Sequence, residues 1–358
     1  MNYKETLCFI ATCLTISLED KNRQAIEKQL KSEMIDWDAV VKVSTSQYVF
    51  PALYCNLKRE DFLQYLPQDL VSYMEYITNL NRNRNEQIIT QAKELNTLLL
   101  ANNIIPIFLK GTGHLLSDLY EDIAERMVGD IDFILSKEDY PKAIEILKNE
   151  KYFSDRELVK IHWHYPRLIH INKIAAVEIH NKVLKEPYSD ILSFEQINKD
   201  AELFSNIKVA SCHDKLLNMV LTKQINDNLY HSKTISLKTV YDVFLLLRKS
   251  NGILPKTNIK KVDKRFNNFI GCVNFLLKIK NLNNFKETNS SKKYLHNYIS
   301  VLNRSKKELL KIQILNIFVR LKEELNILRF SFTSEDYRKH SINRLTSIAY
   351  YKRRFGIK

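Results

Sequence analysis

The chain has 358 residues, 45% of them hydrophobic and 27% charged, so it can bury a large interior but is too long for one small core. We therefore expect two or three subdomains, and the low numbers of Gly (6) and Pro (7) favour mostly helical structure. Five cysteines without a CxxC pair exclude a disulfide framework and a zinc knuckle. This cysteine content fits a reducing cytoplasm best, and no apolar run is long enough to predict a membrane span.

The charge of the chain is unevenly distributed. The formal net charge is +14, but residues 201–358 hold 31 Lys and Arg against 11 Asp and Glu, whereas residues 1–200 hold 24 against 30. A basic C-terminal half is typical of a protein with an anionic partner such as RNA. A solvated basic surface explains the same count, because a nucleic-acid interface also needs its basic residues on one face. Both interpretations stay open.

Residues 1–98 are predicted to form a helical region. Asp36 is a typical N-cap for the helix that follows it, and Pro51 is typical of the first turn of another helix. From residue 66 to residue 103, apolar side chains recur mostly every three or four positions, which predicts one long helix that ends at Asn102-Asn103.

Residues 99–188 are predicted to form a small α/β (α+β) core. The apolar run 104–109 and residues 130–135 indicate two buried strands, each followed by a helix, at 112–120 with Thr112 as its N-cap and at 136–150. Residues 167–172 and 174–180 indicate a hairpin-like pair of strands. The order of strands and helices predicts a small mixed sheet.

Residues 189–358 are predicted to form a basic helical region. Residues 213–224, 237–249 and 295–329 are the clearest helices, and the Lys/Asn-rich stretch 280–293 is typical of an exposed loop. The tail from Arg338 to Lys358 is basic, and Tyr350 and Tyr351 lie within it. This tail suits phosphate contacts and base stacking, but a solvated terminal helix is the more common structure for such a sequence.

Asp130 and Asp132 form the strongest chemical feature of the sequence. Side chains two residues apart on a strand point to the same face, so these carboxylates lie close together on a strand with apolar neighbours. Close carboxylates repel each other unless a cation lies between them, and magnesium prefers such oxygen ligands. Taken alone, the pair also fits a turn followed by a solvated aspartate.

A strand-to-helix turn at Lys110-Gly111-Thr112 precedes this pair by about 19 residues. A glycine at such a turn lets the backbone approach a phosphate, and the amides of the helix start favour an anion. Glu178 and His180 share one face of a later strand, and Glu178 completes a three-carboxylate site if that strand lies beside the one with Asp130 and Asp132. His180 then supports Glu178, contacts a phosphate or simply packs.

His162 and His164 are a weaker candidate for a metal site. The two side chains share one face if the segment is a strand, which suits a metal ion. A packed or surface position is the more common role of such a pair.

The motifs together resemble the uncharacterised bacterial nucleotidyltransferase family, which has a polymerase-beta-like core. The resemblance covers roughly residues 30–250 and is most specific at 104–150. Its positions read here as Leu109-Lys110-Gly111, Tyr120, Arg126, Asp130-Ile131-Asp132, Glu178-Ile179-His180 and, with less specificity, Asp36-Trp37, Tyr48–Pro51 and Asp242. The chain departs from the superfamily at Thr112, where serine is usual.

The resemblance implies a transferase that binds a nucleoside triphosphate such as ATP. Asp130, Asp132 and Glu178 are implied to hold Mg²⁺ (or Mn²⁺), with Glu178 also the base for an acceptor hydroxyl. The implied phosphate-binding residues are Lys110, Gly111, Thr112 and Arg126. A non-catalytic nucleotide- or RNA-binding module that retains the fold is the main alternative. A glycosyltransferase with a metal-binding DxD is a further one, and it differs in releasing a nucleoside diphosphate instead of pyrophosphate.

Overall fold

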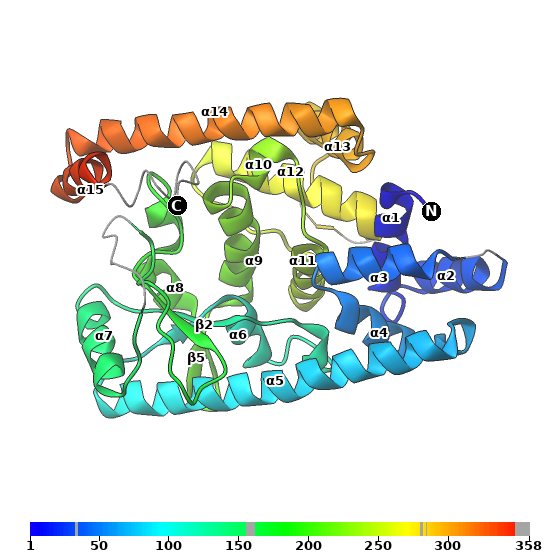
Figure 1. Ribbon diagram of the computed structural model, residues 1–358, viewed down its shortest axis with the longest axis horizontal. Coiled ribbons are helices and arrows are strands. Elements are labelled where there is room, and N and C mark those ends of the chain that lie inside the picture. Colours follow the sequence, from blue (N-terminus) through cyan, green and yellow to red (C-terminus); the bar gives the residue numbers. More distant parts are fainter. Residues whose placement is uncertain (33–34, 155–161, 280–281, 284, 348–358) are drawn as a thin grey trace.

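The computed structural model describes residues 1–32, 35–154, 162–279, 282–283 and 285–347 (Figure 1). Helices surround one small sheet, and the long helices α5 and α14 run along opposite sides of the molecule. Within the described ranges, no helix combines the length and the apolar character that crossing a bilayer requires.

Four helices open the chain. They are α1 (Tyr3–Cys13), α2 (Asp20–Ser32), α3 (Trp37–Ser46) and α4 (Phe50–Arg59), with the short 3-10 turn η1 (Leu63–Tyr65) after them. Asp36 caps α3 as predicted, because its Oδ1 accepts the amide of Ala39 at 3.0 Å. Pro51 lies in the first turn of α4, where its missing N–H leaves no hydrogen bond unmade.

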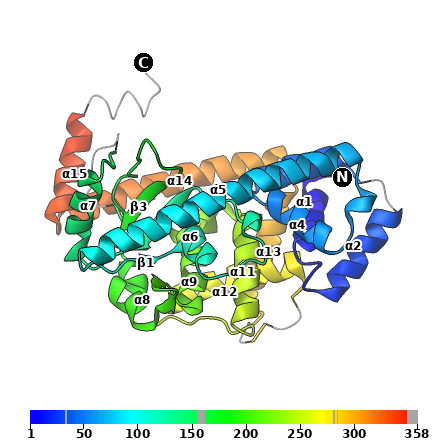
Figure 2. The ribbon, with the colours of Figure 1, turned by 90° about the horizontal axis from the view of Figure 1, so that it is seen from below.

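Helix α5 (Gln68–Ala101) confirms the predicted long helix and spans about 50 Å. It crosses beneath the sheet (Figure 2) and holds the neighbouring loops through buried amides. Asn85 Nδ2 donates to the Arg126 carbonyl at 2.7 Å, and Gln91 Nε2 donates to the Ala175 carbonyl at 2.9 Å. The backbone that leads into the strands at residues 130–134 and 176–180 is therefore fixed by side chains of α5.

The sheet has five strands in the order β3-β2-β1-β5-β4. They are β1 (Ile107–Phe108), β2 (Asp130–Ile134), β3 (Ala176–His180), β4 (Glu202–Phe204) and β5 (Ile207–Val209). Strands β2 and β3 are parallel, as are β1 and β5, whereas β1 with β2 and β4 with β5 are antiparallel. This mixed sheet flanked by helices confirms the predicted fold class. Helix α6 (Lys110–Leu115), the 3-10 turn η2 (Ile123–Glu125) and α7 (Asp139–Asn149) complete the core.

The C-terminal helices pack against the N-terminal ones. They are η3 (Ser189–Leu192), α8 (Phe194–Asp200), α9 (Cys212–Leu221), the π-helical turn η4 (Thr222–Asn226), α10 (Leu229–Ser232), α11 (Leu237–Lys249), α12 (Lys260–Leu277), α13 (Asn289–Leu302), α14 (Lys306–Ser331) and α15 (Glu335–Thr346). Asn22 Nδ2 of α2 donates to the Leu277 carbonyl at the end of α12 at 2.9 Å, so the N-terminal helices and α12 share an interior. The boundaries at residues 98 and 188 stay predictions.

Several sequence-based boundaries were wrong. Helix α6 begins at Lys110, so Thr112 lies inside it and is not its N-cap. Residues 167–172 form only isolated bridges, and β4 and β5 lie where only helices were expected. Helix α13 begins inside the expected loop 280–293, and residues 303–305 interrupt the expected helix 295–329. Residues 348–358 of the basic tail lie outside the described residues.

Candidate active site

Strand pairing places the predicted acidic residues on one face of the sheet. Strands β2 and β3 are parallel, with Asp132 paired to Glu178 and Ile134 paired to His180. Because alternate residues of a strand point to the same side, Asp130 and Asp132 share a face with Glu178 and His180. The expectation that the Glu178 strand lies beside the strand of the aspartates is therefore confirmed.

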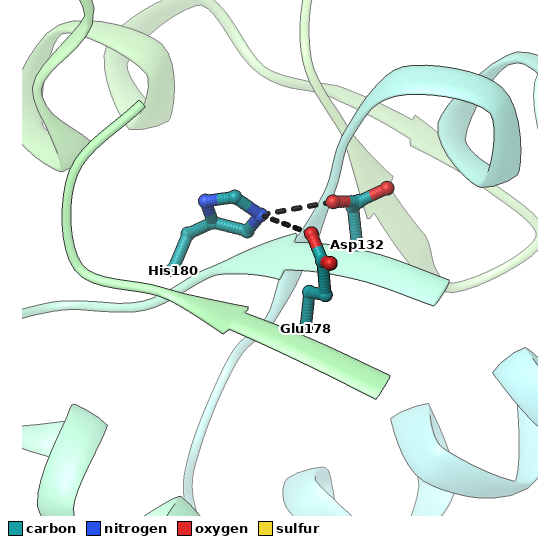
Figure 3. A group of neighbouring side chains, drawn as sticks. All are labelled: Asp132, Glu178 and His180. Atoms are coloured by element: carbon teal, nitrogen blue, oxygen red, sulfur yellow. Dashed lines mark hydrogen bonds and ion pairs between the residues drawn. The ribbon is translucent and has the colours of Figure 1, made fainter. Parts of the chain in front are cut away.

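Asp132, Glu178 and His180 form a buried cluster (Figure 3). His180 Nε2 lies 2.9 Å from Asp132 Oδ1 and 3.7 Å from Glu178 Oε2, and each of the three side chains is less than a tenth exposed. One ligating atom from each lies within 4.8 Å of the others. His180 therefore contacts both acidic side chains and lies closest to Asp132, and its role stays a prediction.

Two cations approach the carboxylates from the open side. Lys110 Nζ lies 2.6 Å from Asp132 Oδ1 and 3.6 Å from Glu178 Oε2. Arg167 bridges Asp130 and Glu178. Its Nη2 lies 2.8 Å from Asp130 Oδ2, and its Nε lies 2.8 Å from Glu178 Oε1. Lys110 has a backbone φ of 48°, which places it in the left-handed region that lysine seldom adopts. The turn from β1 into α6 therefore holds Lys110 against the acidic residues in a backbone conformation that is unfavourable for lysine.

The surroundings shift the pKa values of Asp130 and Asp132 in opposite directions. Burial, followed by the charges of Glu178 and Asp132, raises the pKa of Asp130 to about 6. Burial also favours the protonated form of Asp132, but the Lys110 ammonium and the His180 imidazole outweigh it and lower its pKa. Burial and Lys110 lower the pKa of His180, so its imidazole is neutral at pH 7. A neutral imidazole and an ionised carboxylate are the forms that ligate a metal.

The donor set fits a divalent cation. Carboxylate oxygens suit Mg²⁺, and the added imidazole nitrogen is a ligand that Mn²⁺ also accepts. Over the described ranges, Asp132, Glu178 and His180 are the one group of three ligating side chains close enough to share an ion. Asp130 lies at the start of β2, and its side chain is 23% exposed, so it borders this group on the solvent side.

A pocket of about 320 Å³ opens in front of the carboxylates. The core contributes Lys110, Gly111 and Arg126 to its lining, and the helical region contributes Lys223 and Lys238. The π-helical turn η4 also lines the pocket, and such turns occur often at functional sites. The pocket therefore combines acidic residues at its base with basic residues around it.

Arg126 is fixed by a buried network that joins the core to α11. Its Nε lies 3.0 Å from Asp242 Oδ2, while the Tyr120 hydroxyl donates to Asp242 Oδ1 at 2.6 Å. Arg126 is 6% exposed and Asp242 is fully buried. The structure thus brings together the three residues Tyr120, Arg126 and Asp242 that the sequence singled out, and leaves the guanidinium of Arg126 at the pocket wall.

The turn after β1 has little spare space. A Cβ at Gly111 would lie 3.0 Å from Val128 Cγ2 and 3.7 Å from an Arg126 guanidinium nitrogen, and one at Gly113 would lie 2.7 Å from the Phe108 carbonyl oxygen. Thr112 is buried, and its hydroxyl donates to the Asp130 carbonyl at 2.9 Å. Thr112 therefore positions the backbone of Asp130 in this structure, and its predicted phosphate contact stays a prediction.

Arg167 and Lys238 belong to the site but were missed from the sequence. The bridge between Leu168 and Val177 places Arg167 opposite Glu178 on the neighbouring segment. Counting back from residue 173, which separates the two predicted strands, would instead pair Arg167 with Ile179, so the predicted hairpin did not give this contact. Lys238 reaches the pocket only through the packing of α11 against the core, and no local pattern indicates that contact.

The second histidine pair does not form a metal group of its own among the described residues. His164 packs on His180 with ring centroids 5.2 Å apart, and its Nδ1 lies 2.7 Å from the Tyr165 carbonyl oxygen. His162 stacks on Trp163, which lines the pocket together with His164. His164 is thus packed and His162 is exposed, which are the more common positions that the sequence predicted.

A comparison with known protein families identifies a family for this chain. Neither the curated proteins nor the solved structures include a match to this chain. The model of one protein family, described as an uncharacterised nucleotidyltransferase, matches residues 33–273. That range contains the sheet, the carboxylate cluster, the turn with Lys110 and the helix with Asp242. The chain therefore belongs to the uncharacterised nucleotidyltransferase family.

Proposed function

We propose that the protein transfers a nucleoside monophosphate group from a nucleoside triphosphate to an acceptor hydroxyl in a magnesium-dependent, in-line displacement. The observation that carries this proposal is the cross-strand pair of Asp132 and Glu178, joined by Asp130, at the base of a pocket lined with basic residues. Clustered carboxylates next to basic side chains suit a metal-bound polyphosphate. Membership of a nucleotidyltransferase family supports the same reaction class.

Asp130, Asp132 and Glu178 are the proposed ligands for Mg²⁺, for which Mn²⁺ can substitute, and His180 holds Asp132 in place. When bound, the divalent ions neutralise the charge that develops on the attacking and leaving oxygens. Glu178 is also the proposed acceptor of the proton from the attacking hydroxyl. Arg167 compensates Asp130 and Glu178 in this structure, so it has to leave these oxygens before they serve as ligands.

The triphosphate is proposed to lie against Lys110, Gly111, Thr112 and Arg126. Asp242 orients Arg126 so that its charge is held at the pocket wall at no further conformational cost. Lys238 is a further candidate, because it lines the same pocket as Arg126; burial, followed by the nearby Arg126, lowers its pKa to about 8. Its ammonium lies 4.8 Å from the centroid of the Tyr48 ring, and among the described residues it forms no ion pair with a carboxylate.

The proposal is tested by incubating the purified protein with Mg²⁺, cell extract and each of the four labelled nucleoside triphosphates. The variant is Asp130→Ala/Asp132→Ala, and the matched control is Glu138→Ala/Glu145→Ala, which removes two exposed carboxylates on and beside α7. We expect pyrophosphate release and label transfer in the wild type and the control, and a loss on the order of 10³-fold in the site variant.

Other products point to the alternatives. Release of a nucleoside diphosphate identifies a glycosyltransferase. Magnesium-dependent nucleotide binding without pyrophosphate release or label transfer identifies a non-catalytic nucleotide-binding module. Absence of both binding and transfer, even with extract, contradicts the proposal and makes RNA binding by the basic C-terminal half the function to test.

A further inference from the structure

Helix α14 is apolar but is not buried. Thirteen of its 26 residues are Leu, Ile, Val or Phe, and none of the 26 is buried. Helices of this composition in globular proteins normally lose most of their apolar surface to a neighbour. Figure 1 shows α14 lying along one side of the molecule, in contact with α10, α13 and, near its C-terminal end, α15, with its outer side uncovered.

The apolar residues of α14 form two opposite faces. On the inner face Glu323 accepts hydrogen bonds from Lys185 at 2.6 Å and Asn228 at 2.8 Å, and Ile312, Val319 and Ile327 are half-buried. At 100° per residue, the exposed large side chains other than Leu309 and Leu315 fall on the other face, within a stripe about 100° wide. They are Leu310 (58%), Ile314 (46%), Ile317 (58%), Phe318 (64%), Leu321 (52%), Leu325 (66%), Leu328 (50%) and Phe332 (84%), the last directly after the helix.

This arrangement favours a protein partner over a membrane surface. A helix that lies on a bilayer has one apolar face and one strongly polar face. Helix α14 instead has apolar residues toward its own chain and toward solvent, with polar residues on the two flanks between them. A helix with two apolar faces is covered on both sides by protein.

We infer that the outer face of α14 pairs with the same face of a second copy of this chain, with the two helices antiparallel. Six of the eight exposed apolar residues are symmetric about the midpoint between Ile317 and Phe318, so a twofold axis at that point places apolar positions opposite apolar positions. The opposed pairs are Leu310 with Leu325, Ile314 with Leu321, and Ile317 with Phe318. Leu328 and Phe332 instead fall opposite Lys307 and Asn303. A self-complementary patch of this kind is what a twofold interface requires.

Charge and area are compatible with this pairing. The same axis opposes Lys311 to Glu324; within the chain Lys311 pairs with Glu308 at 3.5 Å and Glu324 with Arg344 at 2.8 Å, so a contact across the axis would extend these pairs. The antiparallel arrangement also sets each helix dipole against the opposite end of its partner. Eight half-exposed or more exposed large side chains offer several hundred Å² of apolar surface per protomer, which approaches the roughly 800 Å² per partner of a stable interface.

Sedimentation of the full chain over a range of concentrations tests the inference. We expect a dimer for the wild type, and for Ile317→Glu/Leu321→Glu a dissociation constant at least 100-fold higher. The control is Tyr76→Glu/Leu80→Glu, which alters an exposed apolar pair with the same spacing on α5 and should leave the dimer intact. A wild type that stays monomeric, or a control that dissociates as the variant does, overturns the inference. The inference is also overturned if the wild type does not self-associate but binds lipid vesicles, and Ile317→Glu/Leu321→Glu abolishes that binding.

A cross-linking experiment tests the antiparallel register. Leu310→Cys and Leu325→Cys proteins are mixed and treated with a short bis-maleimide, with the wild type as control for the five native cysteines. We expect a cross-linked dimer from the mixture. Leu310→Cys alone should give none above the control, because its two copies would lie about 22 Å apart along the axis. Equal cross-linking of Leu310→Cys alone contradicts the antiparallel pairing.

Discussion

In the carboxylate site, charged side chains are buried, whereas on helix α14, apolar side chains are exposed. Asp132, Glu178 and His180 are each less than a tenth exposed and have close partners, while Phe318 and Leu325 are about two-thirds exposed. Both regions depart from the usual rule that apolar residues are buried and charged residues are solvated. The difference indicates that the site provides its own partners, whereas α14 needs a partner from outside the described residues.

Among substitutions of the buried charged residues beside the site, Asp242→Ala is expected to have the largest effect on stability. The change leaves Arg126 buried without its carboxylate, so the free energy of unfolding should fall by about 3–5 kcal/mol. Denaturant titration measures this value. Asp227→Ala is the control, since its partner Lys223 is exposed and the pair contributes at most about 1 kcal/mol. Equal losses in the two variants mean that the buried network is not what joins the core to α11.

A second prediction concerns the tight turn after β1. Gly113→Ala should lower the free energy of unfolding by about 1–3 kcal/mol, because the new Cβ would lie 2.7 Å from the Phe108 carbonyl oxygen. Gly129→Ala is the matched control, with no atom within 4 Å of the new Cβ, and its effect should stay within about 1 kcal/mol. Urea unfolding of the two variants separates these cases, and a harmless Gly113→Ala contradicts the described packing.

The third prediction is a pH dependence of stability in the metal-free protein. The pKa of Asp130 is raised to about 6 in the folded chain and is near 3.9 when unfolded, so folding favours its protonated form. Its stabilising contribution is complete below about pH 4 and is lost as the pH rises through 6. Unfolding in EDTA at pH 4.5 and pH 8 measures this loss, which should be absent from Asp130→Asn. An unchanged pH dependence in that variant excludes Asp130 as its source.

The smallest effect is expected from a substitution of Arg167, which neutralises the charges of Asp130 and Glu178, and it concerns the affinity for a metal ion. Arg167→Gln should raise the affinity for Mn²⁺ alone by about three- to tenfold, because the ion no longer competes with a guanidinium for Asp130 and Glu178. Equilibrium binding followed by electron paramagnetic resonance measures it. Lys173→Gln removes a cation paired with the distant Glu94 and should change nothing. An equal or lower Mn²⁺ affinity in Arg167→Gln contradicts the competition.

The sequence predicted the parts of the site that depend on local spacing. The i and i+2 positions of Asp130 and Asp132, and of Glu178 and His180, determine a shared strand face once the strands are recognised. The same local patterns predicted α5 and α11 closely, because a long apolar periodicity specifies a helix. Asp242 was also identified, through the resemblance.

Features that depend on tertiary packing were not predicted. The short strands β4 and β5 lie between helices and carry too few residues to show an alternating pattern. Lys238 reaches the pocket because α11 packs against the core, and Thr112 turns inward because α6 begins two residues early. The outer face of α14 was recognised only as helical, since its exposure depends on which of its two apolar faces contacts the chain.

The most direct test of the proposed active site is a crystal structure with Mn²⁺ and a non-hydrolysable nucleoside triphosphate, in which anomalous scattering locates the metal. We predict Mn²⁺ bound by Asp130, Asp132 and Glu178, the triphosphate against Lys110 and Arg126, and the Arg167 guanidinium displaced from both carboxylates. Mn²⁺ and nucleotide bound elsewhere, with Arg167 still bridging Asp130 and Glu178, would contradict the proposal that these carboxylates form a nucleotidyltransferase site.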